Sequence, residues 1–349
     1  MPTTGRILAM IARRQFLQSA AALSVLTAGG LSTVPAAFAA PAGPAAKLRI
    51  GYLHGLASDS HLWVAERLGA FKAQNLEVET IQFVSGLEAY QALVGGSLDL
   101  VTTGAVISNF PARGQGKAFL INAVEVATAQ IWVNPKAGIA SVADLKGRKI
   151  ATTRGTTAHF FLHKAFEAAG LNSVADADIV HQPMANAVTS FVSGAVPAVA
   201  TWAPFDVVIA KGAPEAVKLI DGSQVADSSI LNGWSARNEF YAGSKDVLKR
   251  FIRAWIAAND HLATKPEEAL AGLQQDKWPE FPVDELRRQY ALATWDTAAG
   301  WAARIKDGSV VRQLDRVTDF NVQVGAFKDP LGASQYFDPS LFLDVLAGA

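Results

Sequence analysis

The sequence predicts an α/β protein with two lobes, each a mixed, mostly parallel sheet flanked by helices, followed by a helical C-terminal part. Short β-branched runs alternate with segments of helical period between residues 48 and 212. The pattern Val-Gly-Gly-Ser-Leu-Asp-Leu at 94–100 recurs loosely as Val-Ser-Gly-Ala-Val-Pro-Ala-Val at 192–199, which suggests two similar lobes. From about Ser244 onward the apolar residues follow a helical spacing.

The first block of expected elements ends near residue 133. Residues 76–83 alternate apolar and polar side chains, as a strand does, whereas residues 62–71 place apolar side chains at helical spacing. By the same criteria, strands are expected at 48–52, 76–83, 98–101, 119–126 and 129–133, and helices at 62–71, at 86–94 and from 108 to 113.

The second block begins near Asn134 and repeats this alternation. Gly170 follows a segment of helical period and is typical of a helix end. Strands are expected at 149–152, 178–182 and 198–202, and helices at 158–169, 185–193 and 205–212, with further helices at 283–291 and 310–324.

The composition excludes several classes of function. The 349 residues contain no cysteine, so disulfides, cysteine-ligated metals and a thiol nucleophile are excluded. Lys and Arg total 31 and Asp and Glu total 31, which gives no basic excess for binding nucleic acid. Half of the residues are hydrophobic and 18% are charged, as expected for a chain with a large core.

The first 39 residues are typical of an export signal. They contain Arg6, Arg13 and Arg14 but no acidic residue, then a short apolar run at 20–31 and the small-residue end Ala37-Phe38-Ala39. Arg-Arg-x-Phe-Leu resembles a twin-arginine signal. An uncleaved amphipathic helix is the alternative.

Cleavage near Ala39 would leave 28 basic and 31 acidic residues, a mildly acidic protein. Residues 40–46, rich in Pro, Ala and Gly, are expected to form a flexible lead-in. No later segment has 18 consecutive apolar residues, so we expect a soluble product in the periplasm.

Five segments together resemble the periplasmic substrate-binding proteins of ABC importers, in the branch for aliphatic sulfonates, taurine and nitrate. The similarity extends from about Leu48 to about Phe342. The segments are Leu-Arg-Ile-Gly-Tyr at 48–52, Trp-Val-Ala-Glu at 63–66 with Gly-Ala-Phe at 69–71, Gly-Ser-Leu-Asp-Leu at 96–100, Ala-Asp-Leu-Lys-Gly-Arg-Lys-Ile-Ala at 143–151 and Thr-Trp-Ala-Pro at 201–204.

This resemblance implies the two-lobed, type II periplasmic-binding-protein fold, with the ligand in a cleft between lobes that close by a hinge. Lobe one would comprise residues 47–135 plus 235–349, and lobe two residues 136–234. The implied function is a solute receptor, not an enzyme, that delivers a small organic anion to an ABC permease in the inner membrane. An aliphatic sulfonate is the leading ligand; nitrate, taurine and a thiamine or pyrimidine precursor are alternatives. A monomer without a cofactor is expected.

Two loops after expected strands combine hydroxyl groups with glycine just before a helix. They contain Thr103 and Gly104 in one loop, and Gly155, Thr156 and Thr157 in the other. Ligands of parallel α/β sheets lie at the carboxyl ends of the strands, where free N–H groups of a helix suit an oxyanion. The alternative for the threonines is a role as helix caps or strand ends.

Other candidate ligand-binding residues come from these and two further loops. Arg154 could hold an oxyanion through two hydrogen bonds, or lie at the surface or between the lobes. Trp202 could form an aromatic wall or lie in the core. Tyr52 and His54 could add polar contacts, although His54 could equally be a bystander. Asp206 could pair with a ligand amine, but an acid is also common at a helix start.

His159 completes the motif Thr-Thr-x-His at 156–159, which is similar to both the taurine and the alkanesulfonate versions and does not separate them. Relatives in the alkanesulfonate group usually have an acid after the second-loop Thr-Gly, where this chain has Ala105, so ligand specificity is open. His159 and His163 also have the i, i+4 spacing of a metal pair, which leaves an exported metal-dependent enzyme as another alternative. Phe160 replaces the Glu of a zinc protease motif, and no metal is expected.

Overall fold

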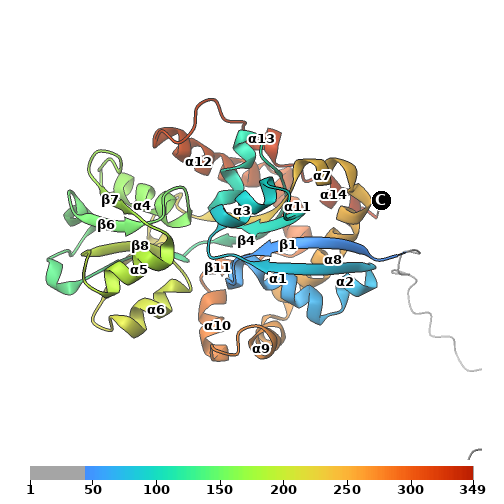
Figure 1. Cartoon of the computed structure of the whole chain (residues 1–349), viewed down its shortest axis with the longest axis horizontal. Helices are drawn as coiled ribbons and strands as arrows, with labels where there is room; N and C mark the ends of the chain where they lie inside the picture. Colours follow the sequence, from blue (N-terminus) through green and yellow to red (C-terminus); the bar gives the residue numbers. More distant parts are fainter. Residues whose placement is uncertain (1–43, 349) are drawn as a thin grey trace, which may run out of the picture. The chain divides into compact units, whose positions relative to one another are not determined.

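The computed structural model describes residues 44–348, which contain two mixed β-sheets (Figure 1). In the first sheet β1 pairs in parallel with β2 and β3, and β10 pairs antiparallel with β3 and β4. Its strand order is β11 (Ala293–Thr294), β4 (Lys117–Glu125), β10 (Ile230–Ala236), β3 (Leu100–Thr103), β1 (Ala46–Tyr52) and β2 (Leu76–Gln82).

The second sheet repeats the arrangement of the first. Here β6 pairs in parallel with β7 and β8, whereas β5 pairs antiparallel with β8 and β9. Its strand order is β7 (Asp178–His181), β6 (Lys149–Thr152), β8 (Ala198–Trp202), β5 (Ala129–Val133) and β9 (Val217–Asp221). Strands β6, β7 and β8 therefore correspond to β1, β2 and β3, as the loose sequence repeat suggested.

Helices follow most of the parallel strands and then fill the C-terminal part. Those between strands are α1 (Leu56–Arg67), α2 (Ala70–Ala73), α3 (Gly86–Val94), α4 (Thr157–Ala168), α5 (Met184–Val192) and α6 (Phe205–Gly212). The later ones are α7 (Asn238–Gly243), α8 (Lys245–Thr264), α9 (Pro266–Asp276), α10 (Val283–Tyr290), α11 (Ala298–Lys306), α12 (Ser309–Gln323), α13 (Ala333–Tyr336) and α14 (Ser340–Leu346). Short 3₁₀ helices are η1 (Ala105–Ser108), η2 (Pro111–Arg113), η3 (Pro135–Ala137), η4 (Val142–Leu145) and η5 (Gly222–Gln224).

Each sheet has its own hydrophobic core. The larger core joins the first sheet to α1 and to C-terminal helices, with Trp234, Trp255 and Trp301 nearly inaccessible to water. Figure 1 shows α8, α11 and α14, in orange to red, on the side of the first sheet. A separate core around Phe161 and Phe166 packs the second sheet against its own helices.

The chain passes between the sheets twice. It leaves β4 for β5 through residues 126–128, and it returns from β9 to β10 through residues 222–229. The two passages meet at Gly222, where an added Cβ would lie 2.2 Å from the backbone oxygen of Val126. The sequence therefore needs glycine at this crossing, because any side chain would collide with the backbone of the other passage.

Most expected elements are confirmed, and two differences have clear physical causes. The helix expected from residue 108 is absent; two 3₁₀ turns flank Phe110, since Pro111 has no N–H to continue a helix. Strand β10 was missed because Asn232, Gly233 and Ser235 weaken its strand pattern. Its neighbours on both sides, β3 and β4, supply the pairing that its own residues do not predict.

The expected export signal, residues 1–39, and residues 40–43 of the lead-in lie outside the described residues; Ala46 is already part of β1. Within residues 44–348, no helix is both long enough and apolar enough to cross a membrane.

Candidate ligand-binding site

A cavity of about 300 Å³ lies where loops from both sheets meet. It receives the starts of α1, α3, η1, α4 and α6, which follow β1, β2, β3, β6 and β8 respectively. The carboxyl ends of parallel strands thus converge on one pocket, as the general rule for such sheets requires. Its lining also includes Glu125 at the end of β4, Thr128 of the first passage, Asn232 of β10, Phe281, and Gln289 of α10.

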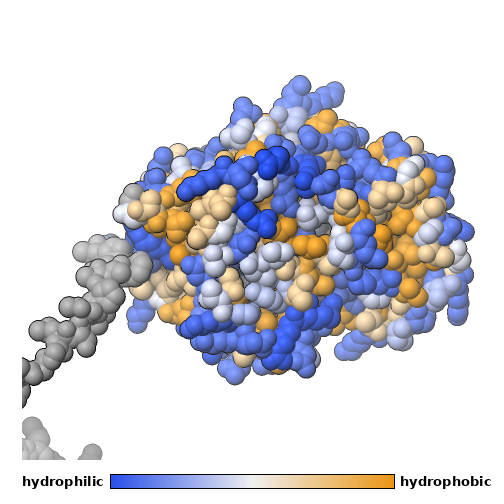
Figure 2. Space-filling model, turned by 180° about the vertical axis from the view of Figure 1, so that it is seen from behind, coloured by the Kyte–Doolittle hydropathy of each residue, from blue (hydrophilic) through white to orange (hydrophobic). Residues whose placement is uncertain are grey.

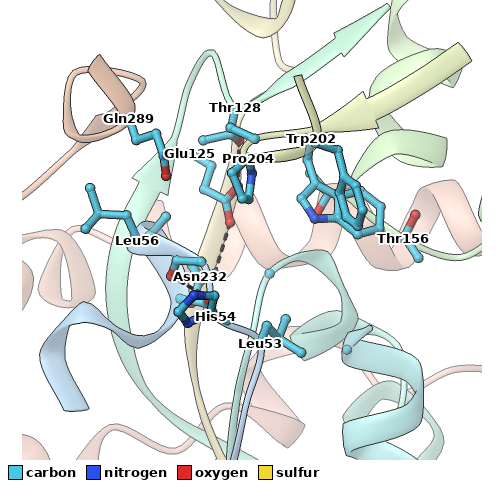
Figure 3. A pocket seen from close by; sticks show the side chains of 18 of the residues that line it. Leu53, His54, Leu56, Glu125, Thr128, Thr156, Trp202, Pro204, Asn232 and Gln289 are labelled. Atoms are coloured by element: carbon cyan, nitrogen blue, oxygen red, sulfur yellow. Dashed lines mark hydrogen bonds between the residues drawn. The ribbon is translucent and has the colours of Figure 1, made fainter. Parts of the chain in front are cut away.

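Most of the pocket wall is apolar. In the view of Figure 3, Leu56 lies on one side of the pocket and Trp202 on the other, with Glu125 between them. The Trp202 ring stands edge-on to Phe205, with 5.7 Å between ring centroids. Val84 and Val208 also line the pocket although each is more than half exposed. The pocket therefore suits a ligand with an apolar body.

The N-termini of α1 and α4 offer hydrogen-bond donors to this space. The residues before them, Gly55 and Thr156, make no side-chain cap, and the Thr156 hydroxyl instead donates to the Thr153 carbonyl at 2.6 Å. Both residues line the pocket. First-turn N–H groups therefore remain available to an oxygen of a ligand.

The two helix starts differ in charge. Asp59 lies in the first turn of α1, fully buried, and accepts hydrogen bonds from the Gly55 N–H at 2.7 Å and the Trp63 indole at 2.8 Å. Burial raises the pKa of Asp59 to about 6. The first turn of α4 contains no acid. The start of α4 is therefore the better place for a negative group.

Glu125 is the charged residue that sequence reasoning overlooked. It ends β4 and is 8% exposed; its Oε1 accepts from Asn232 Nδ2 at 3.0 Å, and its Oε2 accepts from the Thr128 hydroxyl at 2.6 Å (Figure 3). Burial raises the pKa of its carboxyl, whereas these two hydrogen bonds act in the opposite direction. A carboxylate at the end of a mostly apolar strand, residues 117–125, was the available signal.

Five of the residues proposed from sequence line the pocket: His54, Gly104, Thr156, Thr157 and Trp202. Gly104 has little free space, because an added Cβ would lie 2.9 Å from Thr157 Oγ1 and 3.1 Å from Glu125 Oε1. The Thr157 hydroxyl also accepts from the Ala105 N–H at 3.3 Å, which links η1 to α4. The His54 ring stacks on Trp278 with a centroid distance of 5.2 Å.

Three proposed residues lie behind the pocket lining. The Tyr52 hydroxyl donates to Gln82, a lining residue, at 3.2 Å. Thr103 is fully buried, and its hydroxyl has no hydrogen-bond partner among residues 44–348. Asp206 is buried and pairs with Arg288 of α10 at 2.8 Å, so its charge joins α6 to α10.

The remaining three belong to the loop before α4 and its first turn but do not line the cavity. Arg154 is exposed, and its guanidinium approaches the Ile179 carbonyl at 3.4 Å. Gly155 has φ +74°, and its N–H donates to His159 Nδ1 at 3.1 Å. The His159 ring stands edge-on to Phe320, and burial lowers its pKa to about 4.

The spacing of His159 and His163 does not produce a metal site in the described chain. His163 bonds Ser173 at 2.7 Å through Nδ1 and Gln323 at 2.8 Å through Nε2, so both ring nitrogens have protein partners. Within residues 44–348, no three His, Asp or Glu side chains are grouped so as to hold a metal ion.

Comparisons with known proteins agree with this architecture. The profile of the family described as NMT1/THI5 like matches residues 59–269. A Brucella abortus protein named as a binding protein is 28% identical over 327 residues, 93% of this chain and 97% of its own length. An Escherichia coli K12 protein named for binding aliphatic sulfonates is 33% identical over 190 residues, 52% of this chain and 57% of its own.

Among solved structures, the alkanesulfonate-binding protein SsuA of Xanthomonas axonopodis pv. citri, bound to MOPS, superposes with a TM-score of 0.69 at 22% identity. The superposition covers 85% of this chain and all of that one. The family match spans more than half of the chain, and the two sheets with their converging loops form the corresponding fold. The chain therefore belongs to the NMT1/THI5-like family and has the fold of the periplasmic binding proteins.

Proposed function

We propose that the protein is a periplasmic solute receptor that binds a small organic sulfonate and delivers it to an ABC permease in the inner membrane. The observation that carries the proposal is the pocket itself, where helix starts from both sheets meet around apolar walls. The names of the relatives support the ligand class, since one is named for aliphatic sulfonates and one structure contains MOPS. The relatives are named as binding proteins, which favours a receptor over an enzyme.

Closure of two lobes around the ligand fits the surface of the pocket. Figure 2, the view from behind, shows hydrophobic residues interspersed among hydrophilic ones on that face. Two exposed hydrophobic residues line the pocket: Val84, 56% exposed, follows β2, and Val208, 52% exposed, lies on α6. Closure would bury both side chains and stabilise the closed form by roughly 25 cal/mol for each Å² of apolar surface covered. The proposed lobes are residues 47–135 plus 235–349 and residues 136–234.

Export by the twin-arginine route, cleavage near Ala39 and action as a monomer complete the proposal, on the basis of the sequence. Nitrate, taurine and a pyrimidine precursor of thiamine are the alternative ligands. The volume of about 300 Å³ exceeds what nitrate needs, so the cavity favours the larger organic candidates.

A ligand panel tests the proposal. Alkanesulfonates, taurine, nitrate and pyrimidines would be screened by thermal unfolding and then by calorimetry. A true ligand at one hundred times its Kd should stabilise the protein by about 2.7 kcal/mol. Binding of nitrate or a pyrimidine with no response to any sulfonate would replace the proposed ligand class.

A pair of matched variants locates the binding. Thr157→Val removes a hydroxyl that lines the pocket, whereas Thr189→Val removes an exposed hydroxyl on α5 that bonds only the Ala185 carbonyl. We expect Thr157→Val to weaken ligand binding roughly tenfold, the value of one hydrogen bond, and Thr189→Val to leave it unchanged. If the two variants bind the ligand with equal affinity, the binding site does not include Thr157.

A further inference from the structure

Over residues 44–348, the pocket lining contains one carboxyl group, that of Glu125, and neither Lys nor Arg. Among its lining residues, all within the described chain, Glu125 is the one Asp, Glu, Lys or Arg. None of the ion pairs formed among residues 44–348 includes Glu125. A receptor for a simple anion would be expected to present a cation or neutral donors alone, so this carboxylate needs another explanation.

The protein holds the Glu125 carboxylate in place with two donors. Asn232 of β10 donates to one oxygen at 3.0 Å, and Thr128 of the first passage donates to the other at 2.6 Å. These bonds leave each oxygen with a further lone pair, since an ionised carboxylate accepts about four hydrogen bonds. The carboxylate is therefore oriented as an acceptor with spare capacity.

Glu125 also lies close to the place where an anion would be expected. An added Cβ on Gly104 would come within 3.1 Å of Glu125 Oε1 and within 2.9 Å of Thr157 Oγ1, so both oxygens lie near the same point beside Gly104. Thr157 is the first residue of α4. A bare anion at the α4 N-terminus would meet a nearby buried carboxylate, and at short distance in a partly apolar site that repulsion is large.

We propose that the natural ligand carries a nitrogen hydrogen-bond donor, an ammonium, amidinium or aromatic amine, that pairs with Glu125. The inference rests on the proposed receptor function and specifies the ligand of that pocket. The ligand supplies an N–H donor for the spare lone pairs of Glu125, and its remaining part packs against the apolar wall formed by Phe83, Trp202 and Phe205. Glu125 then distinguishes an aminosulfonate from a plain alkanesulfonate, and an aminopyrimidine from a methylpyrimidine.

The opposing possibility is that Glu125 is protonated in the pocket and donates its own hydrogen bond to an oxyanion. The two possibilities predict opposite effects of Glu125→Gln. A glutamine keeps the shape and can still accept from Asn232, but it has lost the charge and offers an N–H donor. Under the proposal, Glu125→Gln should weaken the binding of an amine-bearing ligand and strengthen the binding of a bare anion.

The experiment measures Kd by calorimetry for two matched ligand pairs, 3-aminopropanesulfonate with propanesulfonate, and 4-amino-2-methylpyrimidine with 2,4-dimethylpyrimidine. Wild type, Glu125→Gln and Glu77→Gln would be compared. Glu77 is an exposed residue of β2, so its variant removes an equal charge away from the pocket. Unfolding of each variant without ligand shows whether the fold is intact.

We expect the amine-bearing member of at least one pair to bind wild type roughly ten to one hundred times more tightly than its partner, the range for a hydrogen bond to a charged group. Glu125→Gln should abolish that preference, and Glu77→Gln should retain it. If the member without an amine binds wild type equally well, or the preference survives in Glu125→Gln, the inference is wrong while the receptor function stands. If no member of either pair binds, both the proposed ligand classes and the inference fail.

Discussion

The loops that follow β1 and β6 occupy the same place in the two sheets, yet their left-handed residues differ in what they contact. In each loop a residue two positions before the helix has a left-handed backbone: His54 with φ 54° before α1, and Gly155 with φ 74° before α4. In each, a glycine N–H donates to a side chain four residues later, Gly55 to Asp59 and Gly155 to His159. The backbone design is shared, whereas the side chains are not.

The difference separates a left-handed residue whose side chain contacts the ligand space from one that does not reach it. Gly155 adopts its left-handed geometry without strain and does not line the pocket. His54 adopts the same geometry with a side chain, at a cost of about 1 to 2 kcal/mol, and that side chain does line the pocket. Backbone strain of this kind is typical of functional positions.

The largest expected effect is a pH dependence at Asp59. Its pKa rises from 3.8 to about 6 in the folded protein, so its stabilising contribution is complete below about pH 4 and is lost as the pH rises through 6. The free energy of unfolding of Asp59→Asn, relative to that of wild type, should therefore rise by about 3 kcal/mol from pH 3.5 to pH 7.5. Urea unfolding of both proteins at the two pH values measures this change, and a constant difference would contradict the assignment.

The opposite pH dependence is expected at His159, in the first turn of α4. Its pKa falls from 6.5 to about 4 on folding, so its contribution is present above pH 6.5 and is lost as the pH falls toward 4. The glutamine of His159→Gln is neutral at every pH. The free energy of unfolding of this variant, relative to that of wild type, should therefore rise by about 2 kcal/mol as the pH falls from 7.5 to 4.5. The same unfolding series measures this change. Parallel pH profiles for the two proteins would show that burial does not lower the pKa of the His159 ring.

Gly155→Ala tests whether Gly155 acts on the fold alone. A side chain at φ 74° costs about 1 kcal/mol, and its Cβ would lie 3.3 Å from Asn109 Nδ2. We expect a loss of stability of about 1 kcal/mol with unchanged ligand affinity, measured by unfolding and calorimetry. If the free energy of ligand binding falls by more than the free energy of unfolding, Gly155 belongs to the binding site, as the sequence predicted.

His54→Gly should have the smallest effect on stability. Relief of the left-handed strain, about 1 kcal/mol, is offset by loss of the contacts with Trp278 and Glu280. Ligand affinity should nevertheless fall, because the imidazole lines the pocket. If ligand affinity is unchanged, His54 and Gly155 do not differ in function and the comparison fails.

Local patterns in the sequence predicted the strands whose loops converge on the pocket, because alternation and helical period are properties of short segments. Of the residues predicted in the loops after these strands, His54, Gly104, Thr156, Thr157 and Trp202 line the cavity. This part of the site depends on chain topology, which follows from the order of strands and helices.

The rest of the pocket depends on contacts distant in sequence. Asn232 lies on a strand that is defined by its neighbours on both sides, and Gln289 comes from a C-terminal helix. Arg154 follows the expected loop but turns toward β7, where its N–H donates to His181 and its guanidinium reaches Ile179. No local pattern specifies that direction.

The crossing at Gly222 has a mechanical consequence. The two passages touch with no room for a methyl group between Gly222 and the Val126 carbonyl oxygen. A Gly222→Ala variant could therefore fold only by moving the two passages apart. Gly222 does not line the pocket, so a change at this position would alter how the two sheets are joined without changing a side chain that faces the ligand space.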